Sequence, residues 1–167
     1  MKFLAFVNFY CRLIQKLMTV ILTIMFVSTL IMISGRYIPF IPPFFWTIEV
    51  VRFGMIWMIF LGAAVALRER EHFFVDIMPV KYGKNKNISG ILYIVYAAVI
   101  LIFSYIYIVY GVIYFKDWCL VQHSEILQIN MGFIFFSVPL CGVNSFLFFV
   151  AELVEKKLGI ERKEVQE

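Results

Sequence analysis

The chain has 167 residues, of which 63% are hydrophobic and 19% aromatic, and its mean hydropathy is +0.91. These values lie far outside the range of soluble globular proteins, so they exclude an ordinary soluble domain and make the bilayer the natural solvent. The net charge of +4 comes from basic residues spread over several polar segments. This spread argues against one basic patch that would bind an acidic partner such as nucleic acid.

The N-terminal part of the chain combines an apolar segment, 3–10, with Arg12 and Lys16. We predict a short amphipathic helix here, lying on the cytoplasmic interface. The uncharged run 17–35 follows, and it is long enough to cross a hydrocarbon core of about 30 Å at about 1.5 Å per residue. It exceeds the apolar region of a signal peptide and has no clear cleavage site before Arg36, so we predict that it remains as the first span.

The second span is predicted at 48–67. Its uncharged part, 53–67, is too short to cross alone, so the crossing includes Glu49 and Arg52 at its outer end. Three residues apart, these two share one helix face and can pair with each other or with a second protein. The alternative is that both sit in the outer headgroup region beside Trp46, an interfacial anchor.

The central loop, 68–87, is the longest polar stretch and separates two helical hairpins. Within it, His72 and Asp76 are one helical turn apart. Two residues make an incomplete metal site, and the loop offers no additional histidine to complete one. We therefore predict an interfacial anchor or a docking contact here, and no metal ion.

The third span, 88–115, has small residues at every seventh position, which allow close approach of another helix. They are Gly90, Ala97, Ser104 and Gly111. Tyrosines occupy an adjoining stripe: Tyr93, Tyr96, Tyr107, Tyr110 and Tyr114. Two interpretations remain open, packing inside this one subunit and a seam against a larger partner.

The fourth span, 126–151, repeats the small-residue pattern with Ser137, Cys141 and Ser145 at spacings of four. Pro139 frees a backbone carbonyl that a neighbour must satisfy, so it predicts a kink or a packed interior position. Asn144 in the same span is a candidate for a hydrogen bond between helices.

The basic residues are distributed asymmetrically between the two sides of this four-span layout. The segment before the first span, the central loop and the tail 152–167 together hold twelve of the fifteen. The positive-inside rule therefore predicts that both termini and the central loop are cytoplasmic. We expect a single all-α membrane domain, 1–167, made of two antiparallel hairpins.

No pattern in the chain is typical of an enzyme or of a cofactor site. Cys11, Cys119 and Cys141 fall at three depths, so neither a disulfide framework nor a metal-ligand spacing is visible. Phosphate-binding loops and nucleophile elbows are also missing from the sequence. We predict no catalytic residues, no cofactor and no metal.

The second span and its cytoplasmic exit carry a recognisable order of residues. An acidic residue and an arginine come first, then a tryptophan before a Leu-Gly-Ala-Ala run, then a basic residue and a His-x-x-x-Asp stretch. These are Glu49, Arg52, Trp57, Gly62, Arg68, His72 and Asp76. In this order, and in its four-span layout, the chain resembles the small membrane subunit of tripartite ATP-independent periplasmic (TRAP) transporters.

The resemblance implies a sodium-coupled transporter of three parts in the bacterial inner membrane. An extracytoplasmic solute-binding protein would deliver carboxylates, a large membrane subunit would carry substrate and sodium, and this chain would widen the fixed scaffold and help receive the binding protein. The seven residues of the motif would then serve positioning and partner contact.

Other four-span classes fit less well. A small exporter needs a carboxylate in its first span, and 17–35 has none; a quinone-coupled thiol oxidoreductase needs cysteine pairs in its outer loops, which offer Cys119 alone. An accessory or assembly subunit of another membrane complex remains the main alternative.

Overall fold

The computed structural model describes residues 2–37, 44–69, 86–119 and 121–158, with 86–92 and 118–119 described by their backbone alone. Within these residues, four helical stretches are long and apolar enough to cross a membrane. They are Lys2–Tyr37, Trp46–Glu69, Tyr93–Asp117 and Gly132–Lys157. The predicted all-helical fold with four membrane-spanning helices is confirmed.

Helix α1, Lys2–Tyr37, is continuous over 36 residues. The sequence predicted a separate interfacial helix before a span at 17–35, whereas the structure joins the two, because neither glycine nor proline interrupts the chain before Gly35. The first half has a buried stripe at spacings of three and four, which is the period of one helix face. The stripe consists of Leu4, Val7, Cys11 and Ile14. This segment therefore packs into the core of the chain.

Helix α2, Trp46–Glu69, pairs with α1 through small residues. A Cβ atom added to Gly54 would lie 2.7 Å from the Met25 sulfur, and one added to Gly62 would lie 3.4 Å from the Met18 methyl group. The first turn of α2 is fastened by Thr47, whose hydroxyl donates to the Phe44 carbonyl at 2.6 Å. The contacts of Gly54 and Gly62 with α1 make α1 and α2 the first hairpin.

The second hairpin consists of α4, Lys86–Tyr114, and α6, Ser137–Lys157. A π-helical turn, η1 (Phe115–Cys119), extends α4, and the short α5 (Gly132–Phe135) precedes α6. The predicted fourth span began at residue 126, but 126–131 belong to a loop. Helix α5 ends at Phe135 because its carbonyl would have received the N–H that Pro139 lacks.

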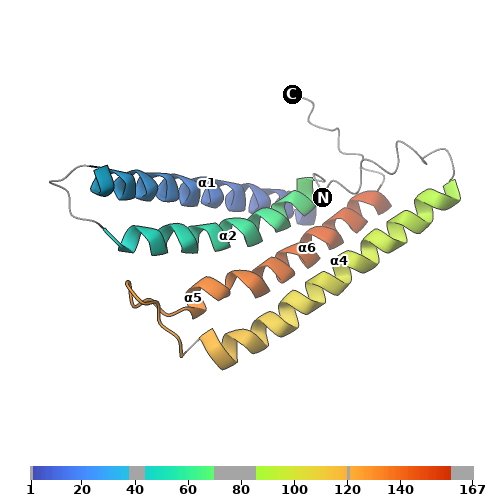
Figure 1. Cartoon of the computed structure of the whole chain (residues 1–167). Helices are drawn as coiled ribbons and strands as arrows, with labels where there is room; N and C mark the ends of the chain where they lie inside the picture. Colours follow the sequence, from blue (N-terminus) through green and yellow to red (C-terminus); the bar gives the residue numbers. More distant parts are fainter. Residues whose placement is uncertain (1, 38–43, 70–85, 120, 159–167) are drawn as a thin grey trace.

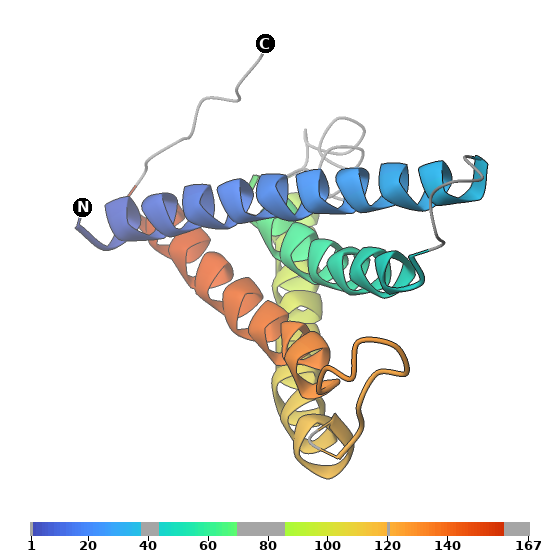
Figure 2. The same cartoon turned by 90° about the vertical axis from the view of Figure 1, so that its left-hand side faces the viewer.

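The helices lie side by side in the order α1, α2, α6, α4, with antiparallel neighbours inside each hairpin (Figure 1). Helices α1 and α6 meet near the N-terminus and then diverge, as Figure 2 shows. The main core lies where α1, α2 and α6 come together. Its buried members are Leu4, Val7, Cys11, Ile14, Leu61, Ala64, Val65, Cys141, Phe148 and Ala151. The outer half of α1 is covered on fewer sides than α6.

Candidate functional site

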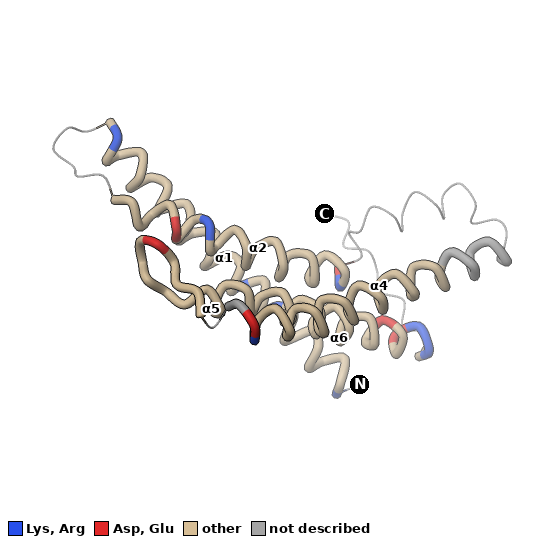
Figure 3. Tube along the Cα trace, turned by 60° about the horizontal axis from the view of Figure 1, so that its bottom comes forward, with Lys and Arg blue, Asp and Glu red and all other residues tan. Residues whose placement is uncertain are grey.

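Helix α4 carries no charged residue over 93–114, and the charged residues of α6 lie toward its C-terminal end (Figure 3). Helix α2 has charged residues at both of its ends, and these make the most extensive polar contacts between elements.

At the inner end of α2, Arg68 connects three helices. Its two terminal nitrogens donate to the two carboxylate oxygens of Glu155 on α6, at 3.1 and 2.6 Å, and one of them also donates to the Asn8 side-chain oxygen on α1 at 2.8 Å. The side chains of Arg68 and Glu155 are 2% and 5% exposed. Such a bidentate, charge-assisted pair fixes orientation as well as distance. The Arg68 guanidinium thus ties α1, α2 and α6 together.

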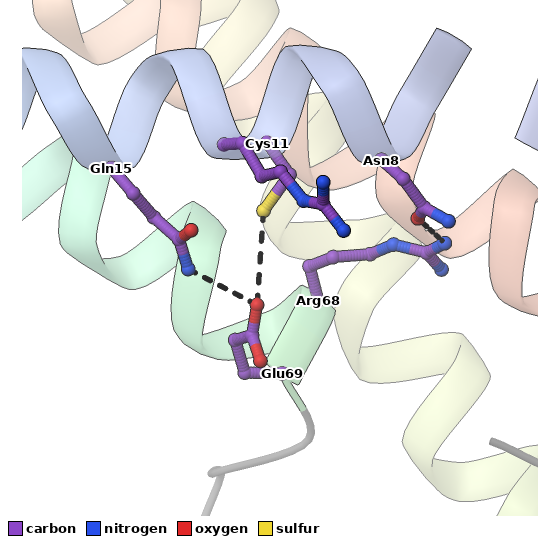
Figure 4. Close-up of a pocket in the computed structure, with 6 residues that line it drawn as sticks. Asn8, Cys11, Gln15, Arg68 and Glu69 are labelled. Atoms are coloured by element: carbon purple, nitrogen blue, oxygen red, sulfur yellow. Dashed lines mark hydrogen bonds between the residues drawn. The ribbon is translucent and has the colours of Figure 1, made fainter. Parts of the chain in front are cut away.

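Beside this ion pair lies an open polar pocket of about 200 Å³, drawn in Figure 4. On its α2 side, Glu69 accepts a hydrogen bond from the Gln15 amide at 3.1 Å and a weak one from the Cys11 thiol at 4.0 Å. The Arg12 side chain also lines the pocket. The pocket is a surface feature of the hairpin contact between α1 and α2.

At the outer end of α2, Glu49 holds the loop that joins the two halves of the second hairpin. Its carboxylate accepts hydrogen bonds from the Ser124 hydroxyl at 2.8 Å, the Ile126 N–H at 3.0 Å and the Leu127 N–H at 2.8 Å. Glu49 is 4% exposed, although it lies near the end of the helix. The carboxylate therefore acts as an acceptor for a turn of the chain more than seventy residues away.

The outer loop, 121–131, has a compact shape of its own. Its two halves are joined by hydrogen bonds from the Ser124 N–H to the Ile129 carbonyl and from the Met131 N–H to the Gln122 carbonyl, both at 2.9 Å. At its end, the Asn130 side-chain oxygen accepts the Gly132 N–H at 2.7 Å. Glu49 thus binds a turn that also has hydrogen bonds of its own.

Arg52 does not pair with Glu49 as the helical spacing allowed. Its side chain is exposed and makes no hydrogen bond or ion pair with any residue that the structure describes. Nearby, Trp46 is exposed and packs on Phe44, with ring centroids 6.3 Å apart. Trp57 is half-buried against Phe133 of α5, with ring centroids 5.7 Å apart.

The small residues of α4 and α6 meet each other inside the chain. A Cβ atom added to Gly111 would lie 3.1 Å from Pro139, and one added to Gly142 would lie 3.0 Å from the Ser104 carbonyl oxygen. Ser104 and Ser137 are buried, and Ala97 packs against the small cluster of Leu67, Ile100 and Phe149. Cys141 contacts Ser145 at 3.9 Å. The spacing of seven on α4 thus corresponds to a face that packs on α6.

For three of the predicted site residues, the structure describes no side chain. His72 and Asp76 lie outside the described residues. Gly90 lies in the first turns of α4, where only the backbone is described.

The family model of the DctQ component of the tripartite ATP-independent periplasmic transporters matches residues 25–158. The chain belongs to the DctQ family. It is therefore a membrane subunit of a TRAP transporter and not an enzyme, and a tripartite transporter implies other subunits. No curated protein matches the sequence closely enough for a comparison.

The matched region of this DctQ chain includes Glu49, Arg68 and Glu155, and it begins after the first half of α1. That first half nevertheless supplies two interhelical contacts. Sequence reasoning missed the one made by Asn8, whereas the hydrogen bond of Asn144 to another helix was expected and is confirmed. Asn8 binds Arg68, and the Tyr10 hydroxyl donates to the Asn144 side-chain oxygen at 2.9 Å. The sequence signal for the Asn8 contact was a single asparagine inside an apolar helix face, because a polar residue in such a place needs a hydrogen-bond partner.

Proposed function

We propose that this DctQ chain is the fixed scaffold subunit of a sodium-coupled TRAP transporter for carboxylate solutes. It holds the large membrane subunit in place and helps receive the solute-binding protein at its outer end. Both termini and the loop 68–87 face the cytoplasm. The seven residues on which the family resemblance rests position the subunit and its partners; they are Glu49, Arg52, Trp57, Gly62, Arg68, His72 and Asp76.

The contact that carries the scaffold proposal is the buried clamp of Arg68 with Glu155 and Asn8. A helix that moved relative to its neighbours during transport would have to separate this pair and leave both charges without their partner, which is unfavourable in a buried site. Glu49 fastens the opposite end of α2 through three hydrogen bonds to the outer loop. Polar contacts at both ends favour a subunit whose helices keep their positions.

The orientation is supported by the position of the charged ends. The start of α1 and the ends of α2 and α6 lie at the same end of the bundle (Figure 1). Lys2, Arg68, Lys156 and Lys157 are at these helix ends, and a side rich in lysine and arginine is cytoplasmic. The loop 121–131 would then face the solute-binding protein.

Orientation can be tested by labelling single cysteines in a background without Cys11, Cys119 and Cys141. Cysteines placed at Lys84 and Asp117 should react with a membrane-impermeant thiol reagent from opposite sides of the membrane. Reaction of both from the outside would contradict the proposed topology.

The function itself is tested by reconstitution in liposomes. Sodium-dependent carboxylate uptake should require this chain together with the large membrane subunit and the solute-binding protein. Uptake driven by the purified chain alone would overturn the scaffold proposal.

A further inference from the structure

The outward face of α4 differs from the other exposed apolar surfaces of the chain by carrying tyrosines at membrane depth. Helix α4 forms one edge of the layer of helices (Figure 1). At about 100° per residue, Ile102, Ile106 and Ile113 form the centre of the face turned away from α6, and Tyr105 and Tyr110 lie on its two flanks. Tyr105 is 65% exposed and Tyr110 is 64% exposed. We call these five residues the outward face of α4.

The two tyrosine hydroxyls lie within the apolar layer of the membrane. Tyr105 precedes Lys116 by eleven residues, which is about 16 Å of helix and about half the hydrocarbon thickness. Tyr110 lies closer to that end, but helical side chains lean toward the N-terminus, which carries its hydroxyl deeper. Neither hydroxyl makes a hydrogen bond within the described part of the chain. A phenol donor in hydrocarbon requires an acceptor from another molecule.

The exposed side of α1 provides the contrast. Four of its serine and threonine hydroxyls are satisfied within the helix, because each donates to the backbone carbonyl four residues earlier. They are Thr19, Thr23, Thr29 and Ser34, at 2.8 to 3.0 Å. A tyrosine hydroxyl on a helix is too far from its own backbone to do the same. These α1 hydroxyls therefore keep their hydrogen bonds when this side of the helix faces lipid. The Tyr105 and Tyr110 hydroxyls of α4, in contrast, need a molecule that offers acceptors.

An open apolar groove of about 360 Å³ lies along the Tyr110 flank. Ile106, Tyr110 and Gly111 of α4 line it together with Phe135 of α5 and Val138 of α6. Side chains of a partner helix can insert here, while its polar groups or exposed carbonyls meet the tyrosine hydroxyls. A lipid tail would fill the groove but would leave both donors without acceptors.

We propose that the outward face of α4 packs against a transmembrane helix of the large membrane subunit, which accepts hydrogen bonds from Tyr105 and Tyr110. This inference rests on the proposed function, in which the chain works as a scaffold bound to that subunit. The free edge of α4 is then the assembly edge, and the free side of α1 faces lipid.

The test measures association of the purified chain with the large subunit in nanodiscs. The double variant Tyr105→Phe with Tyr110→Phe removes two hydroxyls and keeps both rings, so its own fold and thermal unfolding should match those of the wild type. Loss of two membrane hydrogen bonds should weaken association roughly fivefold to tenfold. Tyr37→Phe, at the exposed end of α1, makes the same chemical change as a control and should associate like the wild type.

Site-specific photo-cross-linking gives a second readout that does not depend on hydroxyl groups. A photoreactive residue at Ile106 should cross-link to the large subunit, and one at Val27 on α1 should not. Wild-type association of the double variant, together with cross-linking from Val27 and not from Ile106, would overturn the assignment of the face. Failure of the wild-type chain to bind the large subunit at all would instead overturn the proposed function.

Discussion

The two ends of α2 are both anchored by buried charged side chains, but with different chemistry. At the inner end, Arg68 meets an opposite charge on Glu155. At the outer end, Glu49 accepts its hydrogen bonds from neutral donors, the Ser124 hydroxyl and two backbone N–H groups. The inner anchor joins helices to each other, whereas the outer anchor holds a loop against a helix. Helix α2 therefore serves as a clamp within the bundle at one end and as a support for a surface loop at the other.

This difference predicts the largest loss of stability at the inner end. Arg68→Ala leaves the Glu155 carboxylate buried without its partner, and such a change should lower the free energy of unfolding by about 3 to 5 kcal/mol. Thermal unfolding in nanodiscs measures the effect. Replacing both residues, Arg68→Met with Glu155→Met, removes both charges and should restore most of the loss. A single variant as stable as the wild type would contradict the clamp.

The contact between α4 and α6 should be nearly as sensitive to added volume. A Cβ atom at Gly142 would lie 2.9 Å from the Ile108 side chain and 3.0 Å from a backbone oxygen of α4, so Gly142→Ala should destabilise by about 1 to 3 kcal/mol. Gly62→Ala is the matched control, because its Cβ would meet only the flexible end of Met18 at 3.4 Å. Equal stability of the two variants would show that the helices are not in close contact at Gly142.

At the outer end, Glu49→Gln should have a smaller and more local effect. The amide keeps one acceptor oxygen but turns an NH2 group toward the loop donors, so at least one buried donor loses its acceptor, at a cost of about 1 to 3 kcal/mol. Hydrogen exchange at the Ile126 and Leu127 amides should accelerate, while exchange in the core of α6 stays slow. Arg52→Ala, on the exposed side of the same helix, should leave both unchanged. Acceleration with Arg52→Ala alone would reverse the roles of the two residues.

The smallest expected effect concerns the contact that brings the first half of α1 to α6. Tyr10→Phe removes the hydroxyl that donates to Asn144 and should cost about 0.6 kcal/mol, the average for a hydrogen bond between membrane helices. Chemical unfolding in detergent can resolve this change if Phe9→Leu, an exposed site on the same helix, serves as the control. A loss as large as that of Arg68→Ala would mean that α1 is held mainly by Tyr10.

The length of the uncharged runs predicted the helices well, because a continuous helix satisfies the hydrogen bonds of its own backbone in hydrocarbon. The same criterion failed at 126–131, where Ile126, Leu127 and Ile129 are apolar but form a loop. Apolarity reports the environment of a residue and not its backbone conformation, and here Glu49 supplies the acceptor that the loop N–H groups need. The criterion also separated the first turns of α1 from the span, since Arg12 and Lys16 suggested a boundary that the helix does not have.

The partners of the charged residues were less predictable than the helices. Helical spacing identified Glu49 and Arg52 as neighbours, but it could not reveal that Glu49 would find three donors in a distant loop. Arg68 and Glu155 are 87 residues apart, so their pairing depends on how the hairpins pack. The small residues on α4 were visible as a pattern, yet only the packing on α6 decides which of the two interpretations applies to Ser104 and Gly111.

The central claim, a chain whose helices stay fixed during transport, is tested most directly by locking its two hairpins together. Trp57 and Phe133 pack on each other from opposite hairpins, so Trp57→Cys with Phe133→Cys, in a background without native cysteines, can be joined by a short bifunctional thiol reagent. Uptake is then measured in the complete reconstituted transporter, before and after cross-linking of the same variant. A fixed scaffold predicts the same sodium-dependent uptake in both states. Loss of uptake only after cross-linking would show that the hairpins must move, and would contradict the account.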